Sequence, residues 1–161
     1  MNTTIQSTDK EYFRFEEDFV EDDIRCIPMV VRYKLDACGI KLKLKEWSHF
    51  RPSEREALAS MPCQTEDQNN KYRRYLEGLI WHYTGQTATP LAPISNAPWE
   101  YGKDVPEIVR VRLEENQSTI SFHQWNSLRE LQRFALIKLS SSDHEHKNFR
   151  KALIEFNLAP A

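Results

Sequence analysis

The chain contains an internal repeat, in which residues 27–58 align without a gap on residues 105–136. The offset is 78 residues, and nine of the 32 aligned positions are identical. Three of the identical pairs are Trp47 with Trp125, Arg51 with Arg129 and Arg55 with Arg133. Sequence that repeats itself folds as repeated structural units, so the possible folds reduce to those with two similar halves.

The beginning of each repeat predicts one helix and one strand. Pro28 and Pro106 are expected at first helical positions, where proline is tolerated, and the first helix is expected to end near Gly39. Residues 40–44 and 118–122 then alternate apolar with polar side chains, which is typical of a half-buried strand. Because the two segments occupy equivalent positions, we predict that they pair as a two-stranded ribbon across a pseudo-twofold axis.

The remainder of each repeat has helical spacing of its apolar residues. Pro52 is expected to divide residues 47–61 into two short helices, whereas residues 122–139 are predicted to form one continuous helix. A last helix is predicted around residues 72–79 and around residues 149–156. The predicted fold class is therefore mostly α, with two similar helical halves and a short ribbon.

Composition divides the chain into four segments that we expect to form one compact domain. Residues 1–25 are an acidic N-terminal arm, and residues 26–83 and 105–161 are the two helical repeats. Residues 84–104 hold three of the eight prolines and are predicted to be an extended crossover. Trp99 and Tyr101 suggest that the end of this connector is held against the fold.

Several functional classes are disfavoured by composition. The four glycines are widely separated, so neither a P-loop nor a dinucleotide-binding fingerprint is present. The net charge of −2 argues against a nucleic-acid partner. The sequence has no long apolar run and begins without a secretory signal, so we expect a cytoplasmic chain with no membrane partner. Its three cysteines, Cys26, Cys38 and Cys63, are expected to be reduced thiols, with Cys63 the best candidate for a redox sensor.

The acidic arm has two possible roles. Residues 9–25 carry eight acidic side chains against three basic ones, with Phe13, Phe15, Phe19 and Ile24 among them. In one interpretation the aromatic side chains dock on the core and the acids face water. In the other, an acidic and aromatic strip binds a basic partner. The strip consists of Phe15, Glu16, Glu17, Asp18 and Phe19.

Six cationic residues recur in the two repeats and have two interpretations. In one interpretation they belong to structural ion pairs, with Arg32 bound to Asp36 and Arg110 to Glu114, since a residue and the one four positions later can pair on a helix. Alternatively, guanidinium groups from both halves could converge on an anionic ligand. The six residues are Arg32 and its counterpart in the second repeat, Arg110; Lys34 and its counterpart Arg112; and Arg55 and its counterpart Arg133.

Other chemistry-bearing residues give weaker patterns. Trp47 and Trp125 lie on apolar faces and are expected to anchor the core, with stacking on a pterin or nucleobase as the alternative. His144, His146 and His123 lack a further ligand at metal-binding spacing, so no metal site is predicted. No catalytic arrangement can be identified, and we expect a protein that is not an enzyme and has no cofactor.

Two long blocks of sequence resemble the nitrate reductase-associated proteins, a family of small bacterial proteins. The first block is residues 15–19, 25–29, 31–36 and 38–44 with Trp47, and the second is residues 133–139 with His144, 148–149, 152–153 and 155–156. The resemblance runs from about Phe15 to Leu158. It implies a link to nitrate assimilation, because genes of the family lie near those for nitrate reductase and molybdopterin synthesis. It implies no catalytic or ligand-binding residue.

Two functional hypotheses follow. The first is a non-catalytic accessory protein that binds nitrate reductase or a molybdopterin-synthesis protein, through an exposed apolar patch with a charged rim. The second is a sensor or carrier that holds an anion, pterin or nucleotide between the halves, near Arg32 and Arg110.

Overall fold

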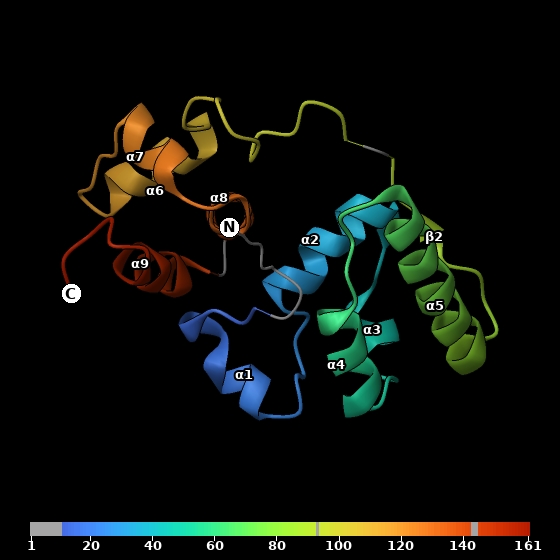
Figure 1. Cartoon of the computed structure of the whole chain (residues 1–161). Coiled ribbons are helices and arrows are strands. Elements are labelled where there is room, and N and C mark those ends of the chain that lie inside the picture. The colour runs from blue at the N-terminus through green and yellow to red at the C-terminus, as the bar shows by residue number, and fades with distance from the viewer. Residues whose placement is uncertain (1–10, 93, 143–144) are drawn as a thin grey trace, which may run out of the picture. The chain divides into compact units, whose positions relative to one another are not determined.

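The structure is a computed structural model that describes residues 11–92, 94–142 and 145–161. The chain divides into two compact units, Met1–Ile94 and Ser95–Ala161. The division lies inside the predicted connector, residues 84–104. Figure 1 labels the α-helices of both units and one of the two strands.

The first unit is mostly helical. A 3₁₀ turn, Arg14–Glu16, leads into α1 (Glu17–Glu21), and α2 (Met29–Cys38) follows. Next come β1 (Ile40–Lys41), α3 (Leu44–Trp47), α4 (Pro52–Ser60), α5 (Glu66–Thr84) and β2 (Thr89–Pro90).

Helix α2 is the centre of the first unit, because it packs on both α4 and α5. The core between them contains fully buried side chains from four helices, including Val31, Trp47, Leu58, Tyr72 and Leu76. Gly39 ends α2 as predicted, with a φ of 78° and its N–H bonded to the Leu35 carbonyl at 2.9 Å. Glycine adopts this left-handed conformation without steric cost.

The second unit consists of α6 (Glu107–Glu115), α7 (Phe122–Ser127), α8 (Glu130–Ser140) and α9 (His146–Glu155). Helix α8 is the most buried element and packs on α6 and α9. Trp125, Phe134 and Phe149 are fully buried in this core. Trp47 and Trp125 are both 0% exposed, which confirms the prediction that they anchor the core.

Three helices begin at equivalent positions in the two units. Helices α2 and α6 start at residues 29 and 107, α3 and α7 at 44 and 122, and α4 and α8 at 52 and 130. Each pair differs by the 78 residues of the sequence repeat. Pro28 and Pro106 precede their helices as extended N-caps, and so lie one residue earlier than predicted.

The predicted ribbon is wrong in its pairing. Ile40 pairs with Pro90 and Lys41 with Thr89 in an antiparallel arrangement, so the partner of β1 is β2. Residues 118–121 form no strand, because this segment caps a helix. The Ser121 hydroxyl accepts the Gln124 N–H at 3.0 Å, and the Gln124 amide oxygen accepts the Ser121 N–H at 2.8 Å. This reciprocal capping box starts α7.

The continuous helix predicted over residues 122–139 is also wrong. Helix α7 ends at Ser127, and α8 begins at Glu130 after two extended residues. The Arg129 N–H donates to the Gln132 side chain at 2.8 Å, and the Arg133 guanidinium donates to the Leu128 carbonyl. These bonds satisfy backbone groups that an uninterrupted helix would have paired internally. The division at Pro52 into α3 and α4 is confirmed.

The two aromatic residues near the end of the connector differ in burial. Trp99 is 8% exposed, as expected for a residue held against the fold, whereas Tyr101 is 77% exposed.

Within the described residues, every helix is too short or too polar to span a bilayer.

Candidate functional site

Lys34 and Arg112 occupy equivalent places and make equivalent contacts. The Lys34 ammonium is 1% exposed and donates to the carbonyls of Ala59 and Met61 at 2.7 and 2.6 Å, at the end of α4. The Arg112 Nε donates to the Ser140 carbonyl at 3.2 Å, at the end of α8. The last carbonyls of a helix lack intrahelical partners and carry the negative end of its dipole. Both cations therefore cap the helix that packs beside their own.

Arg55 and Arg133 also bind backbone carbonyls. Arg55 donates to the Asp23 carbonyl at 2.7 Å and to the Ser48 carbonyl at 3.2 Å, and its guanidinium lies 5.8 Å from the Trp47 ring centre. Arg133 is 3% exposed and donates to the Trp99 carbonyl at 2.7 Å. Arg55 thus holds the segment between α1 and α2, and Arg133 holds the segment that precedes α6.

The remaining pair is Arg32, which is half-buried on α2, and Arg110, which is exposed on α6. The Arg110 Nε donates to the Val105 carbonyl at 3.0 Å. Three of the six cations belong to each unit. An anionic ligand at these residues stays a prediction, and the carbonyl contacts support the structural role.

The acidic strip has both buried and exposed members. Phe15 and Glu16 are 8% and 1% exposed, Phe19 is half-buried, and Glu17 and Asp18 are exposed. The Glu16 carboxylate accepts the Phe13 N–H at 3.0 Å and the Met29 N–H at 2.7 Å. Because Met29 is the first residue of α2, this carboxylate ties the arm to the start of that helix.

A groove in the second unit combines apolar walls with a charged rim. Its volume is about 290 Å³, and it lies between α6 and the start of α7. Apolar residues in its lining are Val105, Leu113, Ile120 and Phe122, and charged ones are Asp104, Arg110 and Glu114. Phe122 is 52% exposed, and Ile108 and Val111 on the outer face of α6 are each 42% exposed. Exposed side chains of this size are typical of binding surfaces.

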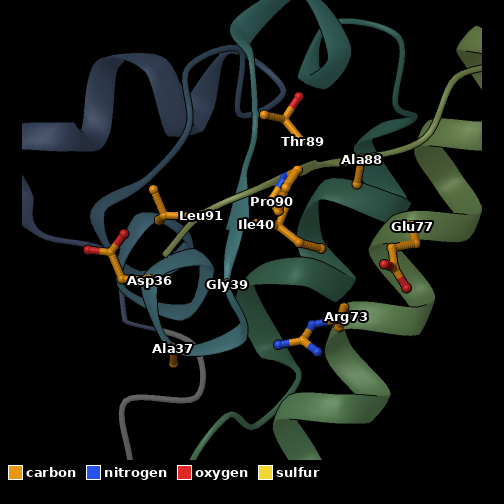
Figure 2. Close-up of a pocket in the computed structure, with 10 residues that line it drawn as sticks. All are labelled: Asp36, Ala37, Gly39, Ile40, Arg73, Glu77, Ala88, Thr89, Pro90 and Leu91. Carbon is orange, nitrogen blue, oxygen red and sulfur yellow. The ribbon is translucent and has the colours of Figure 1, made fainter. Parts of the chain in front are cut away.

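A second cavity lies in the first unit, between the end of α2, the β1–β2 pair and α5. Its volume is about 330 Å³ (Figure 2). Arg73 and Glu77 reach it from α5, and Asp36, Gly39 and Ile40 line it from the other side. The Arg73 Nε donates to the Cys38 carbonyl at 2.7 Å.

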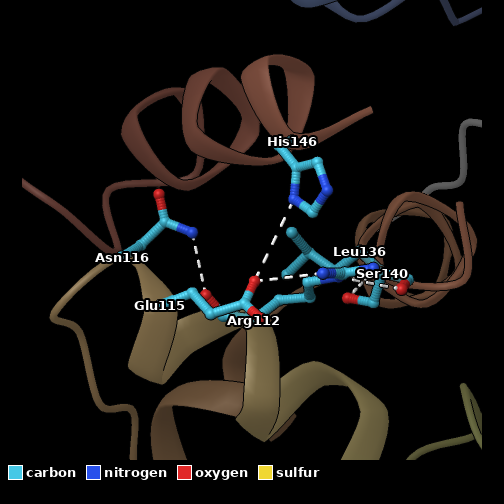
Figure 3. A network of polar contacts seen from close by, with 6 residues as sticks. All are labelled: Arg112, Glu115, Asn116, Leu136, Ser140 and His146. Carbon is cyan, nitrogen blue, oxygen red and sulfur yellow. Dashed lines mark hydrogen bonds and ion pairs between the residues drawn. The ribbon is translucent and has the colours of Figure 1, made fainter. Parts of the chain in front are cut away.

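A polar network joins α6, α8 and α9 in the second unit (Figure 3). The Arg112 guanidinium lies 3.0 Å from the Glu115 carboxylate, and the His146 Nδ1 lies 4.0 Å from the same carboxylate oxygen. His144, which the sequence grouped with His146 and His123, lies outside the described residues. Among the residues described, no group of three or more His, Cys, Asp or Glu side chains is arranged to hold a metal ion.

The three cysteines differ in accessibility. Cys38 is 0% exposed, Cys63 is 8% exposed and Cys26 is half-buried. Burial raises the pKa of the Cys38 thiol to about 11. The thiolate is the reactive form of cysteine, so Cys38 is protected both by its pKa and by its burial.

In the folded protein we therefore expect iodoacetamide to alkylate Cys26 well before Cys38. Mass spectrometry of timed digests measures the two rates, and the urea-unfolded chain is the control in which they become similar. Equal alkylation rates in the folded chain would contradict the structure.

The fold favours the neutral form of the Cys38 thiol. The contribution of this neutral thiol to the stability of the fold is therefore lost as the pH rises from 9.0 towards about 11.

One protein family matches nearly the whole chain. The model of the conserved nitrate reductase-associated protein family aligns with residues 12–156, which include most of both units. The chain belongs to this family. No curated protein and no solved structure matches the chain.

The nitrate reductase-associated chain has site features that sequence reasoning missed. The cavity around Arg73 and Glu77 forms only because α2 ends beside α5 and β2 covers the gap. Arg73 lies outside the repeat alignment of residues 27–58 and was not among the predicted site residues. The role of Glu16 depends on a backbone group 13 residues away, which no local pattern indicates.

Proposed function

We propose that this member of the nitrate reductase-associated family is a non-catalytic accessory protein of nitrate assimilation. It binds nitrate reductase and assists the maturation or regulation of that enzyme. A factor that inserts the molybdopterin cofactor is the alternative partner. Membership of the family supports the link to nitrate reductase, and the groove at α6 and α7 supports binding through a protein surface.

The groove carries this proposal because it has the composition of an interface centre. Aromatic residues are enriched where proteins bind each other. Phe122 lines the apolar groove and is 52% exposed to solvent. Ile120 adds a half-buried apolar side chain to the groove lining. Asp104, Arg110 and Glu114 supply a rim of mixed charge that can fix the orientation of a partner.

The acidic arm is a second contact surface in this proposal. Of the predicted strip, Glu17 and Asp18 expose their carboxylates and Phe19 is half-buried, so these three are the available part. They favour a partner with a basic patch, whose association would weaken as salt concentration rises.

We expect the double variant Ile120→Ser and Phe122→Ser, with both changes in the groove lining, to weaken binding to purified nitrate reductase by about tenfold or more, since truncated interface anchors cost this much. Isothermal titration calorimetry with the full chain measures the change. Leu44→Ser is the matched control, because Leu44 is 58% exposed on α3 and lies outside the groove.

Unchanged affinity for nitrate reductase in the double variant would remove the groove from the interface. Absence of binding by the unaltered chain, together with binding to a cofactor-insertion factor, would transfer the proposal to the alternative partner. Binding to neither protein would overturn it.

A second inference concerns the internal repeat. We infer that the two units descend from one duplicated unit and that the proline-containing connector joins them as a crossover. The matching helix starts and the equivalent contacts of Lys34 and Arg112 support this origin.

A further inference from the structure

The cavity beside α5 contains a guanidinium group held in a fixed orientation. The Nε of Arg73 donates to the Cys38 carbonyl at 2.7 Å, which directs the end of the side chain across the end of α2. The Arg73 Nη2 lies 3.3 Å from the position that a Cβ on Gly39 would occupy. Figure 2 shows the guanidinium extending from α5 towards Gly39. Among the described residues, no hydrogen-bond partner engages the Nη1 and Nη2 atoms of Arg73, so both can donate to a ligand in the cavity.

Glu77 provides the opposite charge one helical turn further along α5. Both side chains line the cavity, and within the described residues no ion pair joins them. The Cys38 carbonyl holds the guanidinium away from this carboxylate. Residues four apart on a helix usually can pair, so the separation leaves a donor site and an acceptor site in one cavity.

The charges in the cavity select the class of ligand. The Arg73 guanidinium shares the cavity with the Glu77 carboxylate, so a lone anion such as nitrate or phosphate would meet repulsion as well as attraction. A ligand with both a carboxylate and an ammonium group matches both sites. The carboxylate accepts two parallel bonds from the Arg73 fork, and the ammonium donates to Glu77.

The remaining walls limit the size of the ligand. Apart from Thr89, they consist of small or apolar residues, namely Ala37, Gly39, Ile40, Ala88, Pro90 and Leu91. The volume of about 330 Å³ is at the lower end of the range of ligand pockets, about 300–1,000 Å³. We propose that this cavity binds a free α-amino acid, with its carboxylate on Arg73 and its ammonium group on Glu77. The proposal is independent of the partner-binding groove.

L-leucine and its two single-charge analogues test the proposal, with isothermal titration calorimetry on the full chain. The analogue 4-methylpentanoate lacks the ammonium group, and 3-methylbutylamine lacks the carboxylate. We expect leucine to bind at least about tenfold more tightly than either, because each loses one charge-assisted contact. The other nineteen protein amino acids are titrated in parallel, since the side-chain preference is open to measurement.

Substitutions in the cavity separate the two contacts. Glu77→Gln should weaken amino-acid binding by about tenfold or more and leave 4-methylpentanoate binding equal or stronger. Arg73→Gln should abolish both amino-acid binding and 4-methylpentanoate binding. Glu66→Gln and Arg74→Gln are matched controls, because these exposed residues lie on α5 outside the cavity.

Two outcomes would overturn the inference. If 4-methylpentanoate binds as tightly as leucine and Glu77→Gln changes neither, the cavity is an anion site. If none of the twenty amino acids gives saturable binding at millimolar concentration, the cavity binds no free amino acid. Circular dichroism of each variant establishes that a loss of binding does not reflect unfolding.

Discussion

We expect Lys34→Ala to lower the free energy of unfolding by about 2–4 kcal/mol. This is one of the two largest effects that we expect in the chain. The ammonium group of Lys34 caps α4 through the carbonyls of Ala59 and Met61. Without it, these carbonyls lie beside a cavity in the core and lose charge-assisted bonds. Urea unfolding of the full chain, followed by circular dichroism, measures the change.

Lys34→Met separates packing from capping at the same position. Methionine fills much of the volume of the lysine stem and carries no charge to desolvate, so we expect a loss of only about 1–2 kcal/mol. Lys41→Ala is the control, because Lys41 is exposed on β1 and its removal should change stability by less than about 0.5 kcal/mol. An Ala variant at position 34 as stable as the unaltered chain would refute the capping role.

Glu16→Ala is expected to cost about 2–4 kcal/mol, because the Glu16 carboxylate joins the arm to the core. Its two oxygens accept the N–H groups of Phe13 and Met29, at 3.0 and 2.7 Å. The Met29 N–H belongs to the first turn of α2, where a negative charge is also favoured by the helix dipole. Urea unfolding measures the loss, and limited proteolysis should show earlier cleavage in residues 17–25.

Two further variants make the Glu16 experiment specific. Glu16→Gln keeps an oxygen that can accept one of the two bonds, so we expect a smaller loss of about 1–2 kcal/mol. Glu17→Ala removes an exposed neighbouring carboxylate and should stay within about 0.5 kcal/mol. If Glu16→Ala and Glu17→Ala have the same effect, the buried carboxylate does not anchor the arm.

The sequence predicts the helices of this fold better than their connections. Helix starts depend on short-range signals such as the proline N-caps and Pro52, and these positions were correctly located to within one residue. The two-residue strand β2 has no comparable local signal, because Thr89 and Pro90 become a strand only by pairing with β1. The break between α7 and α8 was also missed, since an apolar helical period continues across Leu128 and Arg129.

For the candidate sites, too, the sequence predicts residue types and spacings better than the contacts that the residues make. The repeated cations were found because they recur at an offset of 78, yet their contacts with carbonyls follow from packing between helices. Phe122 was expected at the end of a half-buried strand, whereas its exposure beside a groove depends on where α7 begins. Arg73 and Glu77 share a helix face by their spacing, but the cavity that they line needs residues 36–40 and 88–91 to be brought beside them.

Each unit of the chain encloses one fully buried indole, and these two indoles differ in their hydrogen bonding. The Trp47 Nε1 donates to the Ile24 carbonyl at 2.8 Å, whereas the Trp125 Nε1 has no acceptor among the residues that the structure describes. The chain has two further tryptophans, Trp81 and Trp99, and replacing both with Phe leaves Trp47 to report on the first unit and Trp125 on the second. The protein thus carries its own pair of optical labels, and the coincidence or separation of their unfolding transitions measures how cooperatively the two units fold.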